Sequence, residues 1–285
     1  MQRTEAISRA ISLLHNLGQD SCKLSAELIL AHILGCSRLD LIMDNQAEIS
    51  DAALNLYQQQ IVRLSQGEPL AYILGEREFY GLTFQVSPKT LIPRPETELL
   101  IDLALKLYPQ DTKLLFADFG TGSGNIGLTL AHLWPNAFGI LLDKSLGALQ
   151  IASKNAKNLH VQPRVKLLCA DFISPPLKKA SFDLILANPP YIALAEKQDV
   201  MPCVLNFEPK SALFSPNNGS YHLEACVRSA HLLLKQGGYL LVEHGFNQGE
   251  CVRRIFATYG FTKIQTEADL AGHERVTLGC WQSVG

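Results

Sequence analysis

Four residues that follow an apolar run could hold a planar amino group. The run FDLILA, residues 182–187, leads into Asn188, Pro189, Pro190 and Tyr191. The Asn188 side chain offers a carbonyl oxygen, and Pro189, which has no N–H, leaves its own carbonyl free to accept. The two rigid rings would aim both acceptors at one NH₂ group, and Tyr191 would add an aromatic wall. The alternative is a plain turn that ends a strand, because Asn and Pro are common turn residues.

Two acceptors matter because the lone pair of an amide nitrogen is delocalised into its carbonyl group. Hydrogen bonds from both N–H groups would raise the electron density on nitrogen and oppose that delocalisation. Positioning alone supplies about 7–11 kcal/mol in favourable cases. No strong base is needed if the proton leaves after attack. These residue types therefore predict chemistry on an NH₂ group, with a cationic methyl donor as one partner that Tyr191 could face.

A glycine-rich turn, DFGTGSGN, spans residues 118–125 directly after the apolar run LLFA. Gly120, Gly122 and Gly124 would let the backbone bend sharply and approach a ligand closely. A helix is expected to begin at Ile126, and its amides could bind a polar group. The spacing differs from the dinucleotide fingerprint G-x-G-x-x-G. A structural turn without a ligand is the alternative.

Two more strand ends carry acidic residues. Asp143 ends the run AFGILL, where an acid can accept hydrogen bonds from both ribose hydroxyls of a nucleoside. Asp171 and Phe172 follow the run VKLLCA, and a carboxylate beside an aromatic ring suits an adenine. Each acid alone could be a helix cap or a solvated turn. Three such strand ends side by side predict one nucleoside pocket at the carboxyl edge of a sheet.

The elements that must position these residues begin near residue 113. Short β-rich runs alternate there with segments that can hold helices, which predicts a mostly parallel sheet covered on both faces. The runs are LLFAD, AFGILL, RVKLL, FDLILA and YLLVEH. The last stretch, GFTKIQTEADLAGHERVTLGCW, has room for two strands but no helix between them, so the final strand is expected to be antiparallel. The predicted fold class is α/β, with a seven-stranded Rossmann-like sheet.

Three regions are predicted along the chain. Residues 1–75 read as a small helical bundle, residues 76–90 as a β-hairpin linker, and residues 91–285 as the domain that carries the motifs. Within the bundle, we predict one helix that ends at Gly18, one over Ser25 to Leu34 that stops at Gly35, and one capped by Ser50 and closed by Gly67.

Composition excludes some functional classes. The formal charge is −2, so the chain has no overall basic footprint for nucleic acid. The seven cysteines form no Cys-x-x-Cys pair, which favours reduced thiols in a cytoplasmic protein. His32 and Cys36 could share a helix face, but two ligands do not make a zinc site, and no metal is expected. No apolar run is long enough to cross a membrane.

The motifs together resemble class I S-adenosylmethionine-dependent methyltransferases that act on planar NH₂ groups. The stretches EPLAYILGEREFYGLTFQVSPKTLIPRPETELL, NPPYI, FEPKSALFS, EHGFNQ and DLAGHERVTLG further resemble the HemK/PrmC family. This resemblance covers nearly all of the chain from about residue 68. It implies methyl transfer from S-adenosylmethionine to the glutamine amide nitrogen in the Gly-Gly-Gln loop of class 1 peptide chain release factors, leaving S-adenosylhomocysteine. It also implies no direct contact with nucleic acid.

The resemblance assigns roles to residues of this sequence. Contacts to the cofactor are expected from Asp118, Gly120, Thr121, Gly122, Ser123, Gly124, Asp143, Asp171, Phe172 and Asn188. The residues Asn188, Pro189, Pro190 and Tyr191 would hold the target glutamine, with Asn188, Pro189 and Tyr191 catalytic. The segment Arg94, Pro95, Glu96 and Thr97 would wall the site, although a salt bridge to a nearby acid is an equal prospect for Arg94.

Some features leave alternatives open. The stretch NNGSYHLEACVRSA departs from the Asp-Gly-Leu turn of the family, and we interpret it as a changed helix start away from the chemistry. His244 and His273 are expected to be structural. The helical region is expected to help dock the release factor. The nearest rival function is methylation of an adenine or guanine amino group in nucleic acid; a nicotinamide-dependent oxidoreductase and a non-enzymatic binding module are further alternatives.

Overall fold

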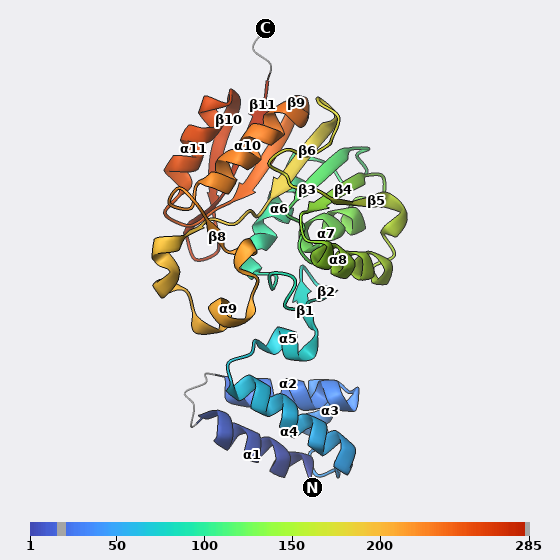
Figure 1. The fold of residues 1–285 in the computed structure, drawn as a ribbon. Coiled ribbons are helices and arrows are strands. Elements are labelled where there is room, and N and C mark those ends of the chain that lie inside the picture. The colour runs from blue at the N-terminus through green and yellow to red at the C-terminus, as the bar shows by residue number, and fades with distance from the viewer. Residues whose placement is uncertain (16–20, 283–285) are drawn as a thin grey trace. The chain divides into compact units, whose positions relative to one another are not determined.

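The computed structural model describes residues 1–15 and 21–282 (Figure 1). Gly18, which is predicted to end the first helix, lies outside these residues. Contacts within the chain divide it into two compact units. One unit contains Met1–Glu76 together with Met201–Phe207, and the other contains Arg77–Val200 together with Glu208–Gly285. The segment Met201–Phe207 joins the first unit although its sequence gives no sign of this.

The first unit is helical, as predicted. Its helices are α1 (Arg3–His15), α2 (Cys22–Leu34), α3 (Arg38–Met43), α4 (Asp51–Ser65), α5 (Leu70–Leu74) and α9 (Pro202–Phe207). Ser50 caps α4 by accepting a hydrogen bond from the backbone N–H of Ala53 at 3.3 Å. Gly35 ends α2 in the left-handed region, with a φ of 64°. The helix predicted from Ser25 therefore ends where expected but begins three residues earlier.

A β-hairpin follows, as the alternating pattern predicts. Strands β1 (Glu76–Phe79) and β2 (Leu82–Gln85) pair across Tyr80 and Gly81, whose φ angles are 52° and 72°. Two positive φ angles are what a tight two-residue hairpin turn requires. The backbone N–H of Tyr80 donates to Glu98 at 2.8 Å, which fastens the turn to the start of helix α6 (Glu98–Leu107).

The predicted α/β fold with a seven-stranded, mostly parallel sheet is confirmed. The strands are β3 (Leu115–Phe119), β4 (Phe138–Asp143), β5 (Val165–Cys169), β6 (Phe182–Ala187), β9 (Leu234–Glu243), β10 (Phe261–Ala268) and β11 (Glu274–Trp281). Their order is β10-β11-β9-β6-β3-β4-β5. Strand β11 runs antiparallel to both neighbours, as expected for the last strand, and the pairs of β3 with β4 and β6 are parallel.

Helices cover both faces of this sheet (Figure 1). They are α6 (Glu98–Leu107), α7 (Asn125–Leu133) and α8 (Leu146–Asn158) on one face, and α10 (Tyr221–Leu233) and α11 (Gly249–Thr258) on the other. Alternate residues of one strand serve the two faces: Phe116 belongs to the first apolar cluster, whereas Ala117 and Phe119 belong to the second. Burial on both faces explains why these strands read as continuous apolar runs.

The remaining elements are short and lie in the connections. They are the 3₁₀ turns η1 (Pro95–Thr97), η2 (Gln162–Arg164), η3 (Leu194–Asp199) and η4 (Lys210–Ala212), and the parallel strand pair β7 (Ile192–Ala193) and β8 (Phe214–Ser215). Among the described residues, every helix is too short or too polar to cross a lipid bilayer.

Two helical glycines give a matched test of how closely α7 approaches the sheet. A Cβ atom on Gly127 of α7 would lie 2.7 Å from Leu141 Cγ and 3.0 Å from Asp118 Oδ2. A Cβ atom on Gly147 of α8 would lie 2.8 Å from Cδ of Lys89, a flexible side chain that can move away. Gly127→Ala should lower the free energy of unfolding by about 1–3 kcal/mol because of overpacking.

Gly147→Ala is the control, and it should leave stability unchanged or raise it by up to about 1 kcal/mol through helix propensity. Urea unfolding followed by circular dichroism measures both variants. Equal midpoints for the two variants would contradict the close packing of α7 against β4.

Candidate active site

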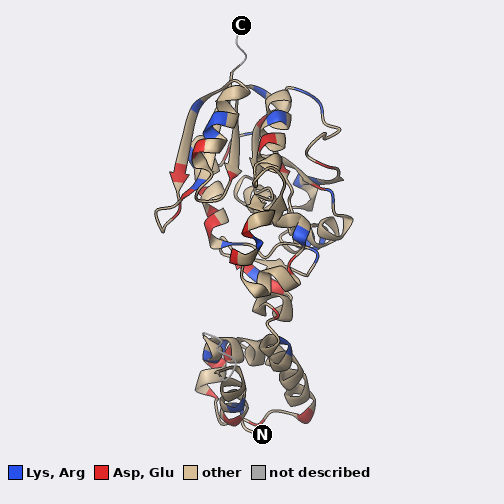
Figure 2. Cartoon of the chain, turned by 60° about the vertical axis from the view of Figure 1, so that its left-hand side comes forward, with Lys and Arg blue, Asp and Glu red and all other residues tan. Residues whose placement is uncertain are grey.

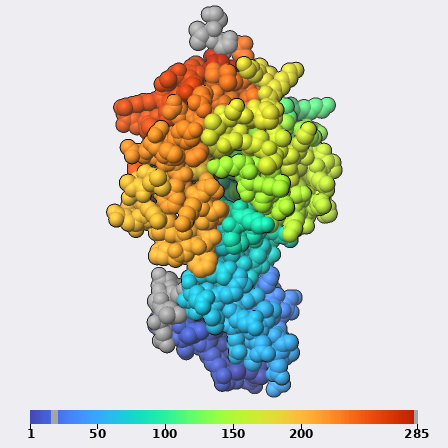
Figure 3. Space-filling model, in the orientation of Figure 1, coloured from blue at the N-terminus to red at the C-terminus, as the bar shows by residue number. Residues whose placement is uncertain are grey.

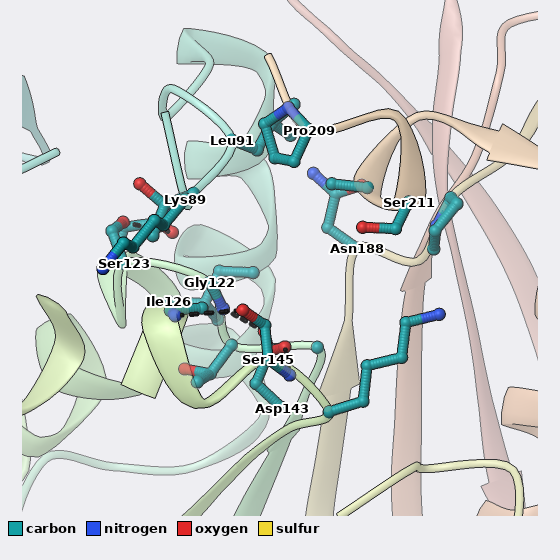
Figure 4. Close-up of a pocket in the computed structure, with 18 of the residues that line it drawn as sticks. Lys89, Leu91, Gly122, Ser123, Ile126, Asp143, Ser145, Asn188, Pro209 and Ser211 are labelled. Carbon is teal, nitrogen blue, oxygen red and sulfur yellow. Dashed lines mark hydrogen bonds between the residues drawn. The ribbon is translucent and has the colours of Figure 1, made fainter. Parts of the chain in front are cut away.

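A cavity opens at the carboxyl ends of β3, β4, β5 and β6. It is lined by the glycine turn, by the residues after β4 and β5, by Asn188 after β6, and by the segments 89–94 and 209–212. In Figure 3 the surface is hollowed where the green, orange and teal segments meet. In the view of Figure 4, Lys89 and Ser123 lie on one side of the cavity and Asn188 and Ser211 on the other. The parallel pairing therefore brings the separated motifs to one place.

Of the seventeen residues predicted for the site, eleven line this cavity and six do not. The lining residues are Arg94, Thr97, Gly120, Thr121, Gly122, Ser123, Asp143, Asp171, Phe172, Asn188 and Pro190. Those outside the lining are Pro95, Glu96, Asp118, Gly124, Pro189 and Tyr191. Glu96 is exposed on η1, whereas Pro189 is buried. The ligand contacts predicted for these residues stay predictions.

The glycine turn bends sharply and leaves its backbone accessible at two of its three glycines. Gly120, Gly122 and Gly124 have φ angles of 71°, 56° and 87°. A Cβ atom on Gly120 or Gly122 would meet nothing closer than 3.9 Å, so both glycines leave free space at the cavity wall. A Cβ atom on Gly124 would instead lie 2.6 Å from Leu128, so this glycine is needed for packing. Helix α7 begins at Asn125, one residue before the predicted start.

Asp118 holds the turn from below. Its Oδ2 accepts hydrogen bonds from the Thr121 hydroxyl at 2.5 Å and from the backbone N–H of Gly127 at 3.0 Å. The side chain is fully buried, and burial raises its pKa to about 6. The visible contacts of Asp118 are thus with the turn and with α7, which explains its place outside the cavity lining.

Asp143 ties the turn to the next strand. One carboxylate oxygen accepts from the backbone N–H of Gly122 at 2.9 Å, a bond drawn in Figure 4, and the other accepts from the N–H of Ser145 at 2.8 Å. Burial raises the pKa of Asp143 above its ordinary value. Ser145 in turn caps α8 by accepting from Ala148 at 3.2 Å. Each carboxylate oxygen keeps a second lone pair that a ligand hydroxyl could use.

Phe172 lines the cavity with its aromatic ring, next to the glycine turn. Its ring stacks on Phe119 with centroids 5.9 Å apart and an interplanar angle of 11°. His222 of α10 meets the same ring edge-on at 6.2 Å. Asp171 also lines the cavity, and its carboxylate accepts from the N–H of Ile173 at 2.9 Å. A flat base between an aromatic face and this acid would find the partners that the sequence suggests.

The Asn-Pro-Pro-Tyr turn is anchored on two sides. Asn188 Nδ2 donates to the Thr97 hydroxyl at 3.1 Å, so the Asn188 amide points its nitrogen at η1. The Tyr191 hydroxyl donates to Glu243 Oε1 at 3.4 Å, and the Tyr191 carbonyl accepts from Gln248 Nε2 at 3.0 Å. Burial raises the pKa of Tyr191, which keeps its phenol neutral. All peptide bonds of the described chain are trans.

The stretch predicted to lie away from the chemistry lies beside it, and that interpretation is wrong. His222 lines the cavity. A Cβ atom on Gly219 would lie 2.2 Å from the carbonyl oxygen of Tyr191. The turn before α10 therefore packs directly on the Asn-Pro-Pro-Tyr turn. Nothing in the local sequence indicates this contact, because it depends on how the connection between β8 and α10 crosses the sheet edge.

Arg94 forms the salt bridge that was one of its two predicted roles, and its predicted role at the active site stays a prediction. It lines the cavity, and its Nη2 lies 2.5 Å from Glu208 Oε1. The Glu208 side chain is 1% exposed, and its other oxygen accepts from the N–H of Ile92 at 3.1 Å. Glu208 thus fixes the segment that walls the cavity. The two residues are 114 positions apart in the sequence, so no local pattern predicts that Glu208 pairs with Arg94.

The two late histidines have structural partners, in agreement with their predicted roles. His244 is fully buried, with Nε2 2.9 Å from the Thr277 hydroxyl, and burial lowers its pKa. His273 packs against Phe246, with ring centroids 5.7 Å apart. Other lining residues were missed at the sequence level, among them Lys89, Lys144 and Ser211, because nothing marks an isolated polar residue on a connection as part of a cavity.

Two family matches and several close relatives bear on this cavity. Residues 5–75 match the PrmC N-terminal domain, and residues 111–275 match a methyltransferase domain. A release factor glutamine methyltransferase of Vibrio cholerae is 40% identical, over 98% of this chain and 96% of that protein. Relatives with the same description from Nitratidesulfovibrio vulgaris and Escherichia coli are 40% and 34% identical, over 90% and 98% of this chain and 87% and 99% of their own lengths.

The pair of Arg94 and Glu208 predicts a measurable coupling. Arg94→Ala leaves the Glu208 carboxylate buried beside the cavity without its cation. Breaking a fully buried ion pair lowers the free energy of unfolding by about 3–5 kcal/mol. Because the Arg94 side chain is one-third exposed, we expect a smaller decrease of about 1–3 kcal/mol. Adding Glu208→Gln should recover part of that loss, because the uncompensated charge is removed.

A double-mutant cycle by chemical unfolding measures this coupling. The control is a cycle on Glu250 and Arg254, an exposed pair on α11 whose coupling should be close to zero. Additive effects of the Arg94 and Glu208 variants would contradict a structural role for their ion pair.

Proposed function

Because the chain belongs to the release factor glutamine methyltransferase family, we propose that it methylates the side-chain amide nitrogen of the glutamine in the Gly-Gly-Gln motif of class 1 peptide chain release factors. The family follows from identities of 34–40% over 90% or more of the chain. The observation that carries the proposal is the meeting of the glycine turn and Asn188 at one cavity. A methyl donor bound at the glycine turn would then be within reach of an amide held by Asn188.

The cavity fits S-adenosylmethionine by the types of residue that line it. Bound there, this cofactor would supply a methyl carbon made electrophilic by the attached sulfonium. The free space at Gly120 and Gly122 would receive its amino-acid end, and the Asp143 carboxylate would accept the ribose hydroxyls. Phe172 and Asp171 would take the adenine. Lys89 and Lys144 place positive charge at the same rim, which suits a ligand that also carries a carboxylate.

The target glutamine would be held by the Asn-Pro-Pro-Tyr turn. Asn188 Oδ1 and the Pro189 carbonyl would each accept one hydrogen of the NH₂ group, since the Asn188 nitrogen is already engaged with Thr97. The two bonds would point the amide lone pair toward the donor side of the cavity. Tyr191, kept neutral by burial, would support the turn from behind rather than remove a proton.

A nucleic-acid amino-methyltransferase would use the same turn on a flipped base. The charge distribution does not favour it. In Figure 2, Lys and Arg are interspersed with Asp and Glu along each unit, and the formal charge is −2. Parallel assays with release factor, tRNA, rRNA and DNA would separate the two substrates.

We also propose that the protein acts in the cytoplasm, since its cysteines include no Cys-x-x-Cys pair.

We further propose that the helical unit contributes to docking of the release factor. Helix α3 exposes Leu39 and Met43, at 65% and 79%. Apolar side chains this exposed on one short helix suit contact with a protein.

One prediction of the proposed function concerns the reaction itself. Incubation of the protein with release factor and S-adenosylmethionine, followed by mass spectrometry of peptides, should find one added methyl group on the glutamine of the Gly-Gly-Gln loop. Asn188→Ala should reduce the rate by about 10²-fold or more. Asp143→Ala should weaken cofactor binding in calorimetry. A methyl group found only on nucleic acid would refute the proposal.

Another prediction of the proposed function concerns docking. A variant with both Leu39→Ser and Met43→Ser should raise the KM for intact release factor roughly tenfold, the effect of losing an interface anchor. The rate on a short Gly-Gly-Gln peptide should not change. Gln59→Ser, an exposed change on α4, is the control. Wild-type kinetics of the double variant on intact factor would argue against docking through α3.

A further inference from the structure

One side chain of the cavity, His222 near the start of α10, is not among the site residues that the sequence predicts. It lines the cavity beside Phe172, whose ring it meets edge-on with the ring centroids 6.2 Å apart. The proposed function places the adenine of S-adenosylmethionine against the same Phe172. The stretch around His222 departs from the turn of the family that the sequence resembles, so that resemblance gives His222 no role. Its role has to follow from its contacts.

The contacts of His222 with Ser215 of β8 determine which ring nitrogen carries the proton. Ser215 Oγ accepts the backbone N–H of His222 at 3.1 Å, and the same Oγ lies 2.8 Å from Nδ1 of the His222 ring. Ser215 is 1% exposed, so the proton of its hydroxyl needs a partner within the protein. Among the hydrogen bonds of the described residues, the contact with Nδ1 is the one that can use this proton. Ser215 therefore donates to Nδ1, and the proton of a neutral ring lies on Nε2.

The neutral state of the ring makes this choice of nitrogen matter. Burial and the charge of Lys144 lower the pKa of His222, and the charge of Asp171 only partly opposes them. A neutral imidazole has one donor and one acceptor nitrogen, which point to nearly opposite sides of the ring. Because Nδ1 faces Ser215, the donor Nε2–H belongs to the other side of a ring that lines the cavity. Nε2 forms no hydrogen bond with any residue that the structure describes.

We propose that His222 is a cofactor-binding residue whose Nε2–H donates to an adenine ring nitrogen next to the amino group, and that Ser215 is the positioning residue that keeps the proton on Nε2. This inference rests on the proposed function and deepens it. Adenine carries acceptor ring nitrogens beside its amino donor. Asp171 would accept from the amino group, and His222 would supply the complementary donor. With the proton on Nδ1 instead, Nε2 would set one acceptor against another.

A matched pair of variants tests the donor. His222→Phe keeps a flat ring against Phe172 but loses the Nε2–H, whereas His222→Gln keeps an N–H at about the same distance from the main chain. Calorimetry with the reaction product, S-adenosylhomocysteine, measures the Kd of each variant. The Kd should rise about 5- to 15-fold in His222→Phe, as expected for one lost hydrogen bond, and no more than about threefold in His222→Gln.

His231→Phe is the control, because it makes the same change on the same helix outside the cavity lining. The His231 ring packs against Tyr259 and Trp281, with ring centroids 5.7 Å and 5.3 Å apart. Its Kd for S-adenosylhomocysteine should equal that of the wild-type protein. Equal affinities of His222→Phe and His222→Gln would contradict a donor role for His222.

Analogues of S-adenosylhomocysteine identify the atom that His222 binds. Each analogue has a C–H in place of N1 or N7, the adenine ring nitrogens on either side of the carbon that carries the amino group. The ratio of the Kd of His222→Phe to that of the wild-type protein should fall to about one for the analogue that lacks the bound nitrogen. It should stay at about 5–15 for the other analogue. The same ratio for S-adenosylhomocysteine and both analogues would overturn the proposed contact.

Nitrogen NMR of the protein without ligand tests the role of Ser215. The His222 ring should show a protonated Nε2 and an unprotonated Nδ1 at neutral pH. Ser215→Ala removes the hydroxyl that donates to Nδ1, so the form with the proton on Nδ1 should become populated, and the Kd for S-adenosylhomocysteine should rise about two- to fivefold. A merely structural role of Ser215 would change stability but not the protonated nitrogen. A protonated Nδ1 in the wild-type protein would overturn the positioning role.

The outcomes separate this inference from the proposed function. A wild-type protein that binds no S-adenosylhomocysteine and methylates no release factor would overturn the proposed function itself. A wild-type protein that does both, together with a His222→Phe variant that binds S-adenosylhomocysteine as tightly, would overturn only the role of His222.

Discussion

The parallel pairing of β3 with β4 and β6 is the constraint on which the site depends. Phe119 pairs with Leu142 on one side and with Ala187 on the other. The next residues of all three strands therefore emerge at one edge of the sheet. Those residues open the glycine turn, supply Asp143 and begin the Asn-Pro-Pro-Tyr turn. Motifs that are some 70 residues apart in sequence become the walls of one cavity because three strands share a direction and a register.

Buried carboxylates hold the turns at this edge of the sheet in fixed positions. Asp118 holds the glycine turn against α7, Asp143 connects it to β4, and Glu243 accepts from the Tyr191 hydroxyl of the Asn-Pro-Pro-Tyr turn. Burial raises the pKa of each of these acids, so each accepts hydrogen bonds at an electrostatic cost. Such a cost is expected at a site where hydrogen-bond acceptors must have fixed positions. A hydrophobic core needs only apolar side chains that fill its volume.

The sequence predicts the fold and the main site motifs because their signals are local. Apolar runs with turn residues give the strands, and the glycine spacing and the two prolines mark the turns. The contacts that complete the site join distant residues. Glu208 meets Arg94, Thr97 meets Asn188 and His222 reaches Phe172 across connections whose paths no local pattern specifies. The interpretation that the stretch before α10 lies away from the chemistry is wrong for the same reason, since only the contact of Gly219 with Tyr191 places it beside the site.

The central claim is that a carboxamide is gripped by two oxygen acceptors beside a methyl donor. A crystal structure of the protein with S-adenosylhomocysteine and a Gly-Gly-Gln peptide tests it most directly. The account predicts the glutamine nitrogen within hydrogen-bond distance of both Asn188 Oδ1 and the Pro189 carbonyl oxygen. The cofactor sulfur should lie in line with the lone pair of that nitrogen. A glutamine bound elsewhere, or an Asn188 amide turned with its nitrogen toward the peptide, would contradict it.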